Sequence, residues 1–350
     1  MIVLSIGNLT ITSPLVLAPM AGISDLPFRL LNRSFGCGLA FTEMISATAL
    51  AHKSKNTLKM LSATADDRPL GIQILGANPD IIKRALDIVS GNAFDIIDFN
   101  AACPASKVVS GGKGAGLLRE PVKLQKLLKL IVENTGVPVT VKIRSGWDNA
   151  SINAVEIALR AQDAGVSGLF IHGRTRMQGH SGQVDYNIIR EVKESLKIPV
   201  IANGDALTPN LVRKLFDETG CDGVAVARGA LGNPWIFSET AEHLKSGAVP
   251  FGPDVYEIAR TMKEHLALII SFHGEKTGVL LFRKFFGWYT GGMAVKELKG
   301  RAFRTGTYDE MLRLIGELHA LPAECHSRGN GNPDSVLSLR LVRNPSFSPI

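Results

Sequence analysis

The sequence predicts an α/β protein, a TIM (β/α)8 barrel followed by a small all-helical domain. Two observations predict this fold class. From residue 15 to about 240, eight short apolar runs alternate with amphipathic segments, and after Pro250 and Pro253 the apolar spacing is wholly helical. Continuous runs rich in β-branched residues are typical of parallel strands buried on both faces. Eight such units in one domain match the number in a TIM barrel.

The expected strands are the apolar runs themselves. They lie at residues 15–18, 39–41, 70–74, 95–99, 139–143, 168–171, 200–202 and 223–226. Helical spacing between them predicts helices over residues 79–88, 124–131, 155–161 and 209–220. Thr208 and Pro209 suit the start of the last helix, and Gly220 suits its end. A doubly wound open sheet is the alternative, but no GxGxxG motif follows the first strand.

The pattern divides the chain into three parts. We expect a barrel domain over residues 1–245, a helical domain over 250–322 and a disordered tail over 323–350, where Ser, Asn, Gly and Pro are frequent. No apolar run reaches about 18 residues, so no membrane span is expected. The N-terminus lacks the pattern of an export signal, and the four cysteines form no CxxC pair. These features predict a cytoplasmic protein without a bound metal.

Positive charge is concentrated in the predicted helical domain. The formal net charge is +7, and the segment 276–304 holds seven basic residues and one acidic residue. A helical face exposed to water is the ordinary explanation of such a run. Basic residues interleaved with aromatic residues also suit a nucleic-acid surface, although aromatic residues equally suit a core, as we expect for Trp288 and Tyr289. The aromatic residues of the segment are Phe282, Phe285, Phe286, Trp288 and Tyr289.

Each expected strand ends in polar or glycine residues. In a TIM barrel the catalytic groups lie at the C-terminal ends of the strands, so these residues predict a ligand site at one end of the barrel. The last two strands are followed by Asn203, Gly204 and Asp205, and by Arg228 with Gly229. Barrels often bind phosphate there, through backbone N–H groups and a short helix. Ordinary tight turns are the alternative interpretation.

Cys103 follows a predicted strand in the run NAACP, residues 100–104. A single thiol on a loop suits a proton donor or a nucleophile, and a small buried hydrophobe is the alternative. Lys142 lies at a strand end, where a buried lysine needs an anionic partner or loses its charge. Gln73 and His172 can hydrogen-bond to the edges of a planar ring, although an inward histidine is more often a core residue. Together with a phosphate site, these residues indicate FMN.

Several motifs together resemble those of the tRNA-dihydrouridine synthases, most nearly the bacterial B type. The motifs are LAPMAG (17–22), GIQ (71–73), DFN (98–100), CP (103–104), VKIR (141–144), IHGRT (171–175), NGD (203–205), RGA (228–230) and PW (234–235). The resemblance spans roughly residues 10 to 320. The chain departs from it at Ala102 and Ala227, where the family usually has glycine. We expect these one-methyl changes to leave the site intact.

The resemblance implies an FMN-dependent enzyme that reduces uridine in tRNA to 5,6-dihydrouridine, with NADPH or NADH as the reductant. Hydride from reduced FMN would reach C6 of the uracil, and Cys103 would protonate C5. The helical domain would help to bind tRNA. The implied FMN contacts are Pro19, Met20, Ala21, Gln73, Lys142, His172, Asn203, Gly204, Asp205, Ala227 and Arg228. The expected tRNA contacts are Asn100, Lys107, Arg144, Arg174, Arg283, Lys284 and Lys296.

Two other functions fit parts of the sequence. A flavin-dependent reductase of a free small pyrimidine, similar to dihydroorotate dehydrogenases, would use the same barrel but would not need the basic helical domain. A non-catalytic RNA-binding barrel would be excluded by bound FMN that NADPH reduces. For the enzyme itself we expect a monomer that binds neither a membrane nor a metal.

Overall fold

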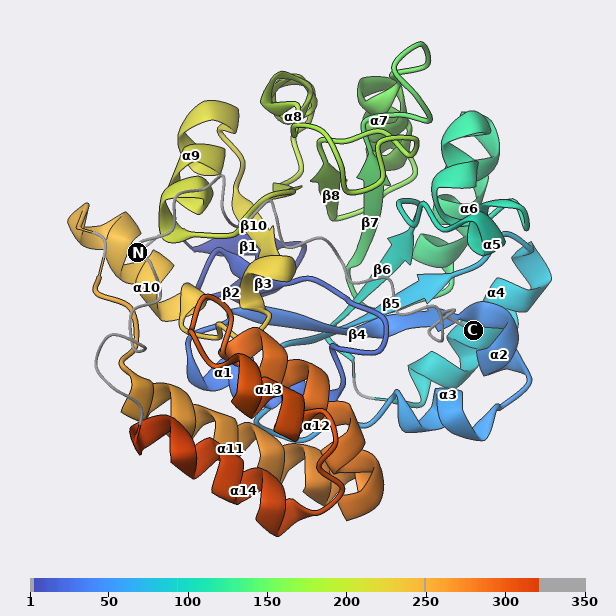
Figure 1. Ribbon diagram of the computed structural model, residues 1–350. Helices are drawn as coiled ribbons and strands as arrows, with labels where there is room; N and C mark the ends of the chain where they lie inside the picture. Colours follow the sequence, from blue (N-terminus) through green and yellow to red (C-terminus); the bar gives the residue numbers. More distant parts are fainter. Residues whose placement is uncertain (1–2, 93, 249, 321–350) are drawn as a thin grey trace. The chain divides into compact units, whose positions relative to one another are not determined.

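Eight parallel strands form a closed barrel with helices around its outside (Figure 1). The computed structural model describes residues 3–92, 94–248 and 250–320. Around the barrel the strand order is β10-β3-β4-β5-β6-β7-β8-β9, so the first barrel strand pairs with the last. The closed parallel barrel confirms the predicted fold class and excludes the doubly wound open sheet. The strands are β3 (Leu15–Leu17), β4 (Leu39–Ser46), β5 (Leu70–Leu75), β6 (Ile96–Asn100), β7 (Val139–Arg144), β8 (Gly168–His172), β9 (Val200–Asn203) and β10 (Gly223–Val226).

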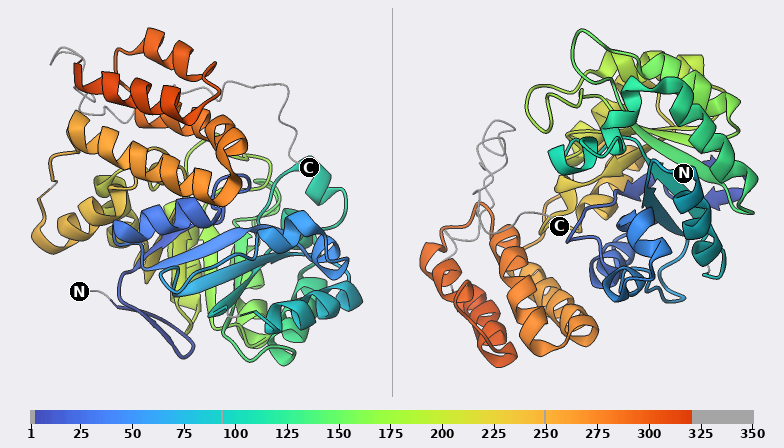
Figure 2. Two further views of the ribbon diagram at one scale, coloured as in Figure 1. Left: turned by 90° about the horizontal axis from the view of Figure 1, so that it is seen from below. Right: turned by 90° about the vertical axis from the view of Figure 1, so that its right-hand side faces the viewer.

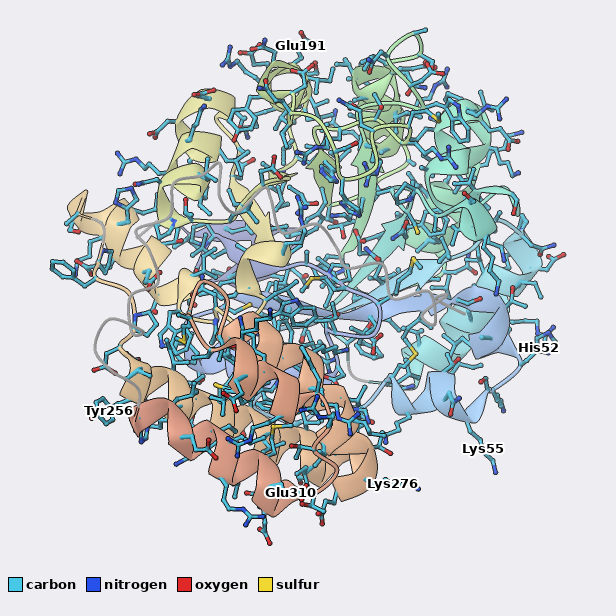
Figure 3. All side chains as sticks on the ribbon, viewed as in Figure 1. His52, Lys55, Glu191, Tyr256, Lys276 and Glu310 are labelled. Atoms are coloured by element: carbon cyan, nitrogen blue, oxygen red, sulfur yellow. The ribbon has the colours of Figure 1, made fainter. Side chains whose placement is uncertain are left out.

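Helices that follow the strands cover the barrel, and α9 shows how the sequence sets their limits. It begins after Thr208, whose hydroxyl accepts a hydrogen bond from Leu211 N (3.3 Å), and it ends at Gly220, which has a left-handed φ of 64°. Polar side chains such as Glu191 on α8 point outward (Figure 3). The helices of this unit are α1 (Leu26–Ser34), α2 (Ala47–Ala51), α3 (Lys55–Lys59), α4 (Pro79–Ser90), α5 (Ser106–Val109), η1 (Gly114–Arg119), α6 (Pro121–Glu133), α7 (Ala154–Asp163), α8 (Tyr186–Ser195), α9 (Pro209–Thr219), η2 (Arg228–Ala230) and α10 (Ile236–Ser246).

An N-terminal hairpin closes the end of the barrel where the strands begin. Its strands, β1 (Leu4–Ile6) and β2 (Leu9–Ile11), are antiparallel. Ile6 packs against Gly168 at the start of β8, and apolar residues of both hairpin strands join the core inside the barrel. The sequence analysis does not predict this hairpin, because strands of three residues give too short a pattern. With this end filled, a ligand reaches the barrel axis from the C-terminal ends of the strands.

The described residues beyond Pro250 form a second compact unit together with residues 231–234. Helices α11 and α12 pack side by side in it (Figure 2). Tyr289 is buried, as expected, with His265 Nδ1 lying 3.1 Å from its hydroxyl, whereas Trp288 is half-buried. The expected tail over 323–350 lies outside the described residues. The helices are α11 (Val255–His273), α12 (Glu275–Tyr289), α13 (Lys296–Ala302), α14 (Tyr308–Glu317) and η3 (Leu318–Ala320).

Within the described ranges, no helix combines the length and the hydrophobicity that a membrane-spanning helix requires.

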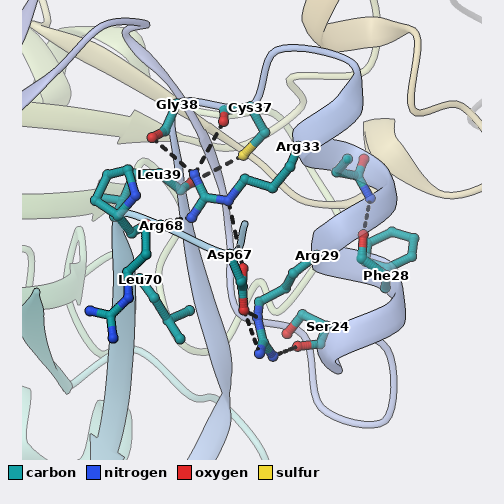
Figure 4. A network of polar contacts seen from close by, with 12 residues as sticks. Ser24, Phe28, Arg29, Arg33, Cys37, Gly38, Leu39, Asp67, Arg68 and Leu70 are labelled. Atoms are coloured by element: carbon teal, nitrogen blue, oxygen red, sulfur yellow. Dashed lines mark hydrogen bonds and ion pairs between the residues drawn. The ribbon is translucent and has the colours of Figure 1, made fainter. Parts of the chain in front are cut away.

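A buried network of charges holds the loop between β3 and α1 (Figure 4). Arg29 and Asp67 are almost fully buried and form an ion pair at 2.8 Å. The Arg29 guanidinium also donates to the carbonyl oxygens of Ser24 (2.9 Å) and Ser62 (2.8 Å). Arg33 adds a second ion pair to Asp67 at 3.6 Å. Because a buried charge is costly unless it is paired, this network fixes the chain on both sides of it.

We expect Asp67→Ala to lower the free energy of unfolding by about 3–5 kcal/mol, because it leaves the Arg29 guanidinium buried without a carboxylate. Urea unfolding followed by fluorescence and circular dichroism measures the change. Glu156→Ala is the matched control, since it removes a carboxylate from the exposed pair with Arg160 (2.9 Å). That loss should cost about 0.3–0.5 kcal/mol. Equal effects of the two substitutions would contradict a structural role for the buried network.

Candidate active site

Buried polar side chains from neighbouring strands meet at the C-terminal end of the barrel. Asn100 Nδ2 donates to Gln73 Oε1 (2.7 Å), and Gln73 Nε2 donates to Asp98 Oδ2 (2.7 Å). The hydroxyl of Thr140 donates to the other carboxylate oxygen of Asp98 (2.8 Å). All four side chains are buried, so each depends on its neighbours rather than on water. Gln73 and Asn100, both predicted site residues, are therefore in direct contact.

Asp98 and Lys142 place opposite charges inside the barrel. Burial raises the pKa of Asp98 to about 6 and lowers the pKa of Lys142 to about 8, and the attraction between the two groups opposes both shifts. Lys142 Nζ donates to Asn203 Oδ1 (2.8 Å). Pro19 and Lys142 also line one small cavity together with Asp98, so the structure brings these predicted residues close to one another.

The backbone around Cys103 is held by the side chain of Asn100. Asn100 Oδ1 accepts hydrogen bonds from the N–H groups of Cys103 (2.9 Å) and Ala102 (3.1 Å). The Cys103 carbonyl accepts from Ala115 N–H (3.0 Å). The Cys103 side chain is half-buried, and this burial raises the pKa of its thiol above the ordinary value. The thiol is thus protonated at neutral pH, which suits a proton donor better than a nucleophile.

Arg144 and Arg174 are buried, and loop carbonyls accept hydrogen bonds from both guanidinium groups. Arg144 donates from Nε to Ala102 (2.8 Å) and from Nη1 to Gly179 (2.8 Å), while Arg174 donates from Nε to Ser181 (3.1 Å). Both arginines are among the expected tRNA contacts, as is the buried Asn100. In the structure Arg144 contacts the backbone next to Cys103, Arg174 contacts the loop after β8, and Asn100 contacts Gln73.

A second charged group lies at the ends of β8, β9 and β10. Asp205 Oδ1 accepts from Arg174 Nη1 (3.0 Å) and from Arg228 Nη2 (2.9 Å). His172 Nε2 lies 3.4 Å from Arg174 Nη1, and burial, with the nearby cations, lowers the pKa of His172 well below its ordinary value. Gly204 has a φ of 127°, which residues with side chains rarely adopt. The Arg228 side chain is exposed, so an anion can reach it.

The loop after β3 contains Pro19, Met20 and Ala21, which the sequence predicts as cofactor contacts. Met20 N–H donates to the Ser24 hydroxyl (2.9 Å), and Ser24 N–H donates to the Met20 carbonyl (2.9 Å). Ser24 is in turn held by Arg29 of the buried network. The three predicted residues remain partly or fully exposed at this end of the barrel.

Alanine is compatible with the backbone at positions 102 and 227, where the resembled family usually has glycine. Ala102 is buried and Ala227 is half-buried. Neither residue has a positive φ, so the backbone does not require glycine at either position.

Three expected tRNA contacts lie in the helical unit. Arg283 donates from Nε to the carbonyl of Thr305 (3.0 Å), which ties α12 to the chain after α13. Lys284 Nζ lies 5.1 Å from the centroid of the Phe285 ring. Lys296 is exposed at the start of α13. Of the three, Lys296 is therefore the most accessible to a partner.

Known proteins provide an independent comparison. The sequence model of the family described as Dihydrouridine synthase (Dus) matches residues 16–317. The chain belongs to this family.

Relatives in the dihydrouridine synthase family cover most of the chain. The chain is 40% identical over 291 residues to a probable tRNA-dihydrouridine synthase of Rickettsia conorii, a match that covers 83% of this chain and 88% of that protein. It is 39% identical over 333 residues to tRNA-dihydrouridine synthase B of Pseudomonas aeruginosa, covering 95% and 99% of the two chains. The resemblance to the bacterial B type is confirmed.

Solved structures with a similar fold are more distant in sequence. Histamine dehydrogenase from Rhizobium sp. 4-9 is 12% identical with a TM-score of 0.55, and the match covers 76% of this chain and 50% of that one. Morphinone reductase is 14% identical with a TM-score of 0.51, covering 73% and 91%. At these identities the similarity supports the barrel fold alone.

Three residues of this dihydrouridine synthase family member stand near the site but are not among the predicted site residues. Asp98 accepts the hydrogen bond of Gln73, and its signal was a carboxylate within an apolar strand. The His180 ring lies 6.2 Å from that of His172, and burial, with the surrounding cations, lowers the pKa of His180 to about 4. Trp147 lies in the loop after β7 beneath two arginines. For His180 and Trp147, no pattern in the sequence indicates these contacts, which only the folded loops show.

We expect Cys103 to react with iodoacetamide more slowly at neutral pH than a free cysteine does, because its raised pKa leaves less thiolate. Peptide mass spectrometry across a pH series measures the labelling, and the midpoint for Cys103 should lie above the value of about 8.5 for free cysteine. The buried Cys221 is an internal control that should stay unlabelled in the native protein. A midpoint below the free value would favour the nucleophile interpretation.

Proposed function

We propose that this chain reduces uridine in tRNA to 5,6-dihydrouridine, with FMN as its bound cofactor and NADPH or NADH as the reductant. Membership of the dihydrouridine synthase family supports the reaction. In the chain itself, the observation that carries the proposal is the half-buried thiol of Cys103 just after β6, on a backbone that Asn100 holds and with a pKa that burial raises. Reduction of a carbon–carbon double bond needs a proton donor, whereas a non-catalytic RNA-binding barrel does not.

The polar groups at the strand ends fit a flavin mononucleotide. Lys142 Nζ donates to Asn203 near the barrel axis, where an ammonium would suit the negative charge of a reduced flavin ring. Gln73 and the neutral His172 would hydrogen-bond to the ring edges. When bound, FMN would supply the hydride that adds to C6 of the uracil. The further proposed contacts are Pro19, Met20 and Ala21 for the ring, and Asn203, Gly204, Asp205, Ala227 and Arg228 for the ribityl and phosphate groups.

Cys103 acts in this proposal as the general acid. As hydride adds to C6, the electron pair of the C5–C6 double bond takes the proton from the Cys103 thiol, so a C5–H bond forms while the S–H bond breaks. The thiolate then regains a proton from water. The raised pKa of Cys103 keeps the thiol protonated before each turnover. Because only the protonated form donates, the rate should fall as the pH rises through this pKa.

The tRNA contacts are proposed to come from Lys107 and Lys296, which are exposed, and from Lys284, which is half-buried. Lys107 is exposed on α5, four residues after Cys103, and Lys284 and Lys296 lie on the helical unit. The side chains engaged by carbonyls or amides would act indirectly, by holding the loops or helices that meet the RNA. These are Asn100, Arg144, Arg174 and Arg283. We further propose that the enzyme works as a monomer in the cytoplasm, where tRNA is available.

We expect Cys103→Ala to lower the rate of dihydrouridine formation by roughly 10²–10⁴-fold, because the reaction loses its general acid. The variant should still bind FMN and should still be reduced by NADPH. Dihydrouridine in transcribed tRNA, measured by mass spectrometry, gives the rate. The control is Cys221→Ala, which removes a buried thiol just before β10 begins, at the opposite end of that strand from Ala227 and Arg228, and should retain activity. Full activity of Cys103→Ala would remove this residue from the mechanism.

The proposed function also predicts a change in cellular tRNA. Deletion of the gene should remove dihydrouridine from one defined tRNA position, because the cell then lacks the enzyme that is proposed to form it there. Sequencing of tRNA after chemical treatment that marks dihydrouridine locates the lost residue. Re-expression of the wild-type chain should restore it and Cys103→Ala should not. An unchanged pattern after deletion would overturn the proposed function.

A further inference from the structure

Two arginines on the barrel unit gather over one tryptophan without an acidic partner among the described residues. The guanidinium carbons of Arg119 and Arg176 lie 4.9 and 4.8 Å from the centroid of the Trp147 ring. Within the described ranges, the Arg119 side chain makes no hydrogen bond or ion pair. The Arg176 side chain donates to the Met177 sulfur (3.0 Å), and its Nε is buried without a partner. Two neighbouring cations repel each other, so this arrangement favours an anion.

The loops that carry this cluster adjoin the loop of Cys103. Trp147 follows β7 and Arg176 follows β8, and two backbone hydrogen bonds of 2.9 and 3.0 Å join the two loops. Arg119 is the last residue of η1 (Gly114–Arg119), and the start of that helix is bonded to the Cys103 carbonyl (3.0 Å). All three residues therefore lie in loops at the C-terminal ends of the strands. Their backbone is fixed before any ligand binds.

Hollows on the surface flank Trp147. Their volumes are about 570 and 540 Å³, which is within the size range of sites for small ligands and is enough for a nucleotide. Asp148 lines both hollows, but its carboxylate already accepts from the Ser151 hydroxyl (2.7 Å) and from Ala150 N–H (3.0 Å). The cluster thus contains two guanidinium groups and one carboxylate, and that carboxylate already accepts hydrogen bonds from Ser151 and Ala150. The cluster keeps an excess of positive charge.

We propose that Arg119 and Arg176 bind backbone phosphates of the tRNA next to the uridine that enters the site, and that Trp147 holds the two guanidinium groups in place. The inference rests on the proposed function for the identity of the RNA. Phosphate contacts from arginine fix the register of a nucleic acid on a protein, which is what a site for one particular uridine requires. The planar faces of the two arginines are supported by the indole, so little side-chain freedom is lost on binding.

Binding of transcribed tRNA to the full chain, followed by fluorescence anisotropy at several salt concentrations, tests the arginines. The double variant Arg119→Ala/Arg176→Ala should weaken binding on the order of tenfold. The slope of log K against log salt should fall by about 0.7–0.9 for each phosphate that the variant no longer binds. The matched control Arg160→Ala/Arg213→Ala removes the same charge from exposed pairs with Glu156 and Asp217. It should leave the slope unchanged.

Variants of Trp147 test its positioning role without changing the net charge. Trp147→Leu should weaken tRNA binding, because the two guanidinium groups lose their support. Trp147→Phe keeps an aromatic ring and should restore most of the affinity. Equal affinities for Trp147→Leu and the wild-type chain would contradict the positioning role of the indole.

The outcomes separate this inference from the proposed function. Wild-type affinity and salt slope in the double variant would overturn the inference, even if dihydrouridine forms normally. If the double variant binds tRNA more weakly, as expected, but the wild-type chain forms no dihydrouridine, the proposed function alone is overturned. A third outcome concerns NADPH, which also carries phosphate groups. The double variant could slow reduction of the bound flavin by NADPH and leave tRNA binding unchanged. In that case the two arginines bind the dinucleotide and the inference is wrong.

Discussion

Polar groups inside a closed barrel must satisfy one another, and the rest of the site depends on this constraint. Asp98, buried in β6, receives hydrogen bonds from Gln73 and Thr140, which fixes the orientation of the Gln73 amide. The Gln73 carbonyl accepts from Asn100 Nδ2 and so orients the Asn100 amide, whose oxygen accepts from the Cys103 N–H. The backbone position of Cys103 is thus set by a carboxylate within the apolar run of β6, through the side-chain amides of Gln73 and Asn100, which cannot rotate independently.

Buried arginines hold the loops of this protein in place through hydrogen bonds to backbone carbonyls. Arg29 donates to the carbonyl oxygens of Ser24 and Ser62, and Arg144 and Arg174 donate to carbonyl oxygens of the loops that follow β6 and β8. A guanidinium suits this role because its several donors lie in one plane and reach carbonyls of different segments at once. The irregular segments at the open end of the barrel are therefore shaped by charge, whereas the barrel beneath them is shaped by apolar packing.

Topology explains which predictions from the sequence succeeded. A strand buried on both faces shows as a continuous apolar run, so all eight barrel strands were predictable, and the residues after each run had to meet at one end. The contact between Gln73 and Asn100 follows from that rule. The hydrogen-bond acceptors of Arg144 and Arg174 do not follow from that rule. A basic residue in a sequence reveals its charge but not the carbonyl group that will lie beside it. The expectation that these two arginines contact RNA stays a prediction, and the structure adds their hydrogen bonds to loop carbonyls.

The pairing of the first barrel strand with the last affects how the chain is made. One edge of β3 has no partner until β10, which ends at Val226, has left the ribosome. An exposed strand edge can pair with another chain, and incomplete barrels are therefore prone to aggregate. Since β3 is only three residues long, it offers a nascent chain little edge to pair with. The shortness of this strand protects the protein during synthesis, before any of its enzymatic features exist.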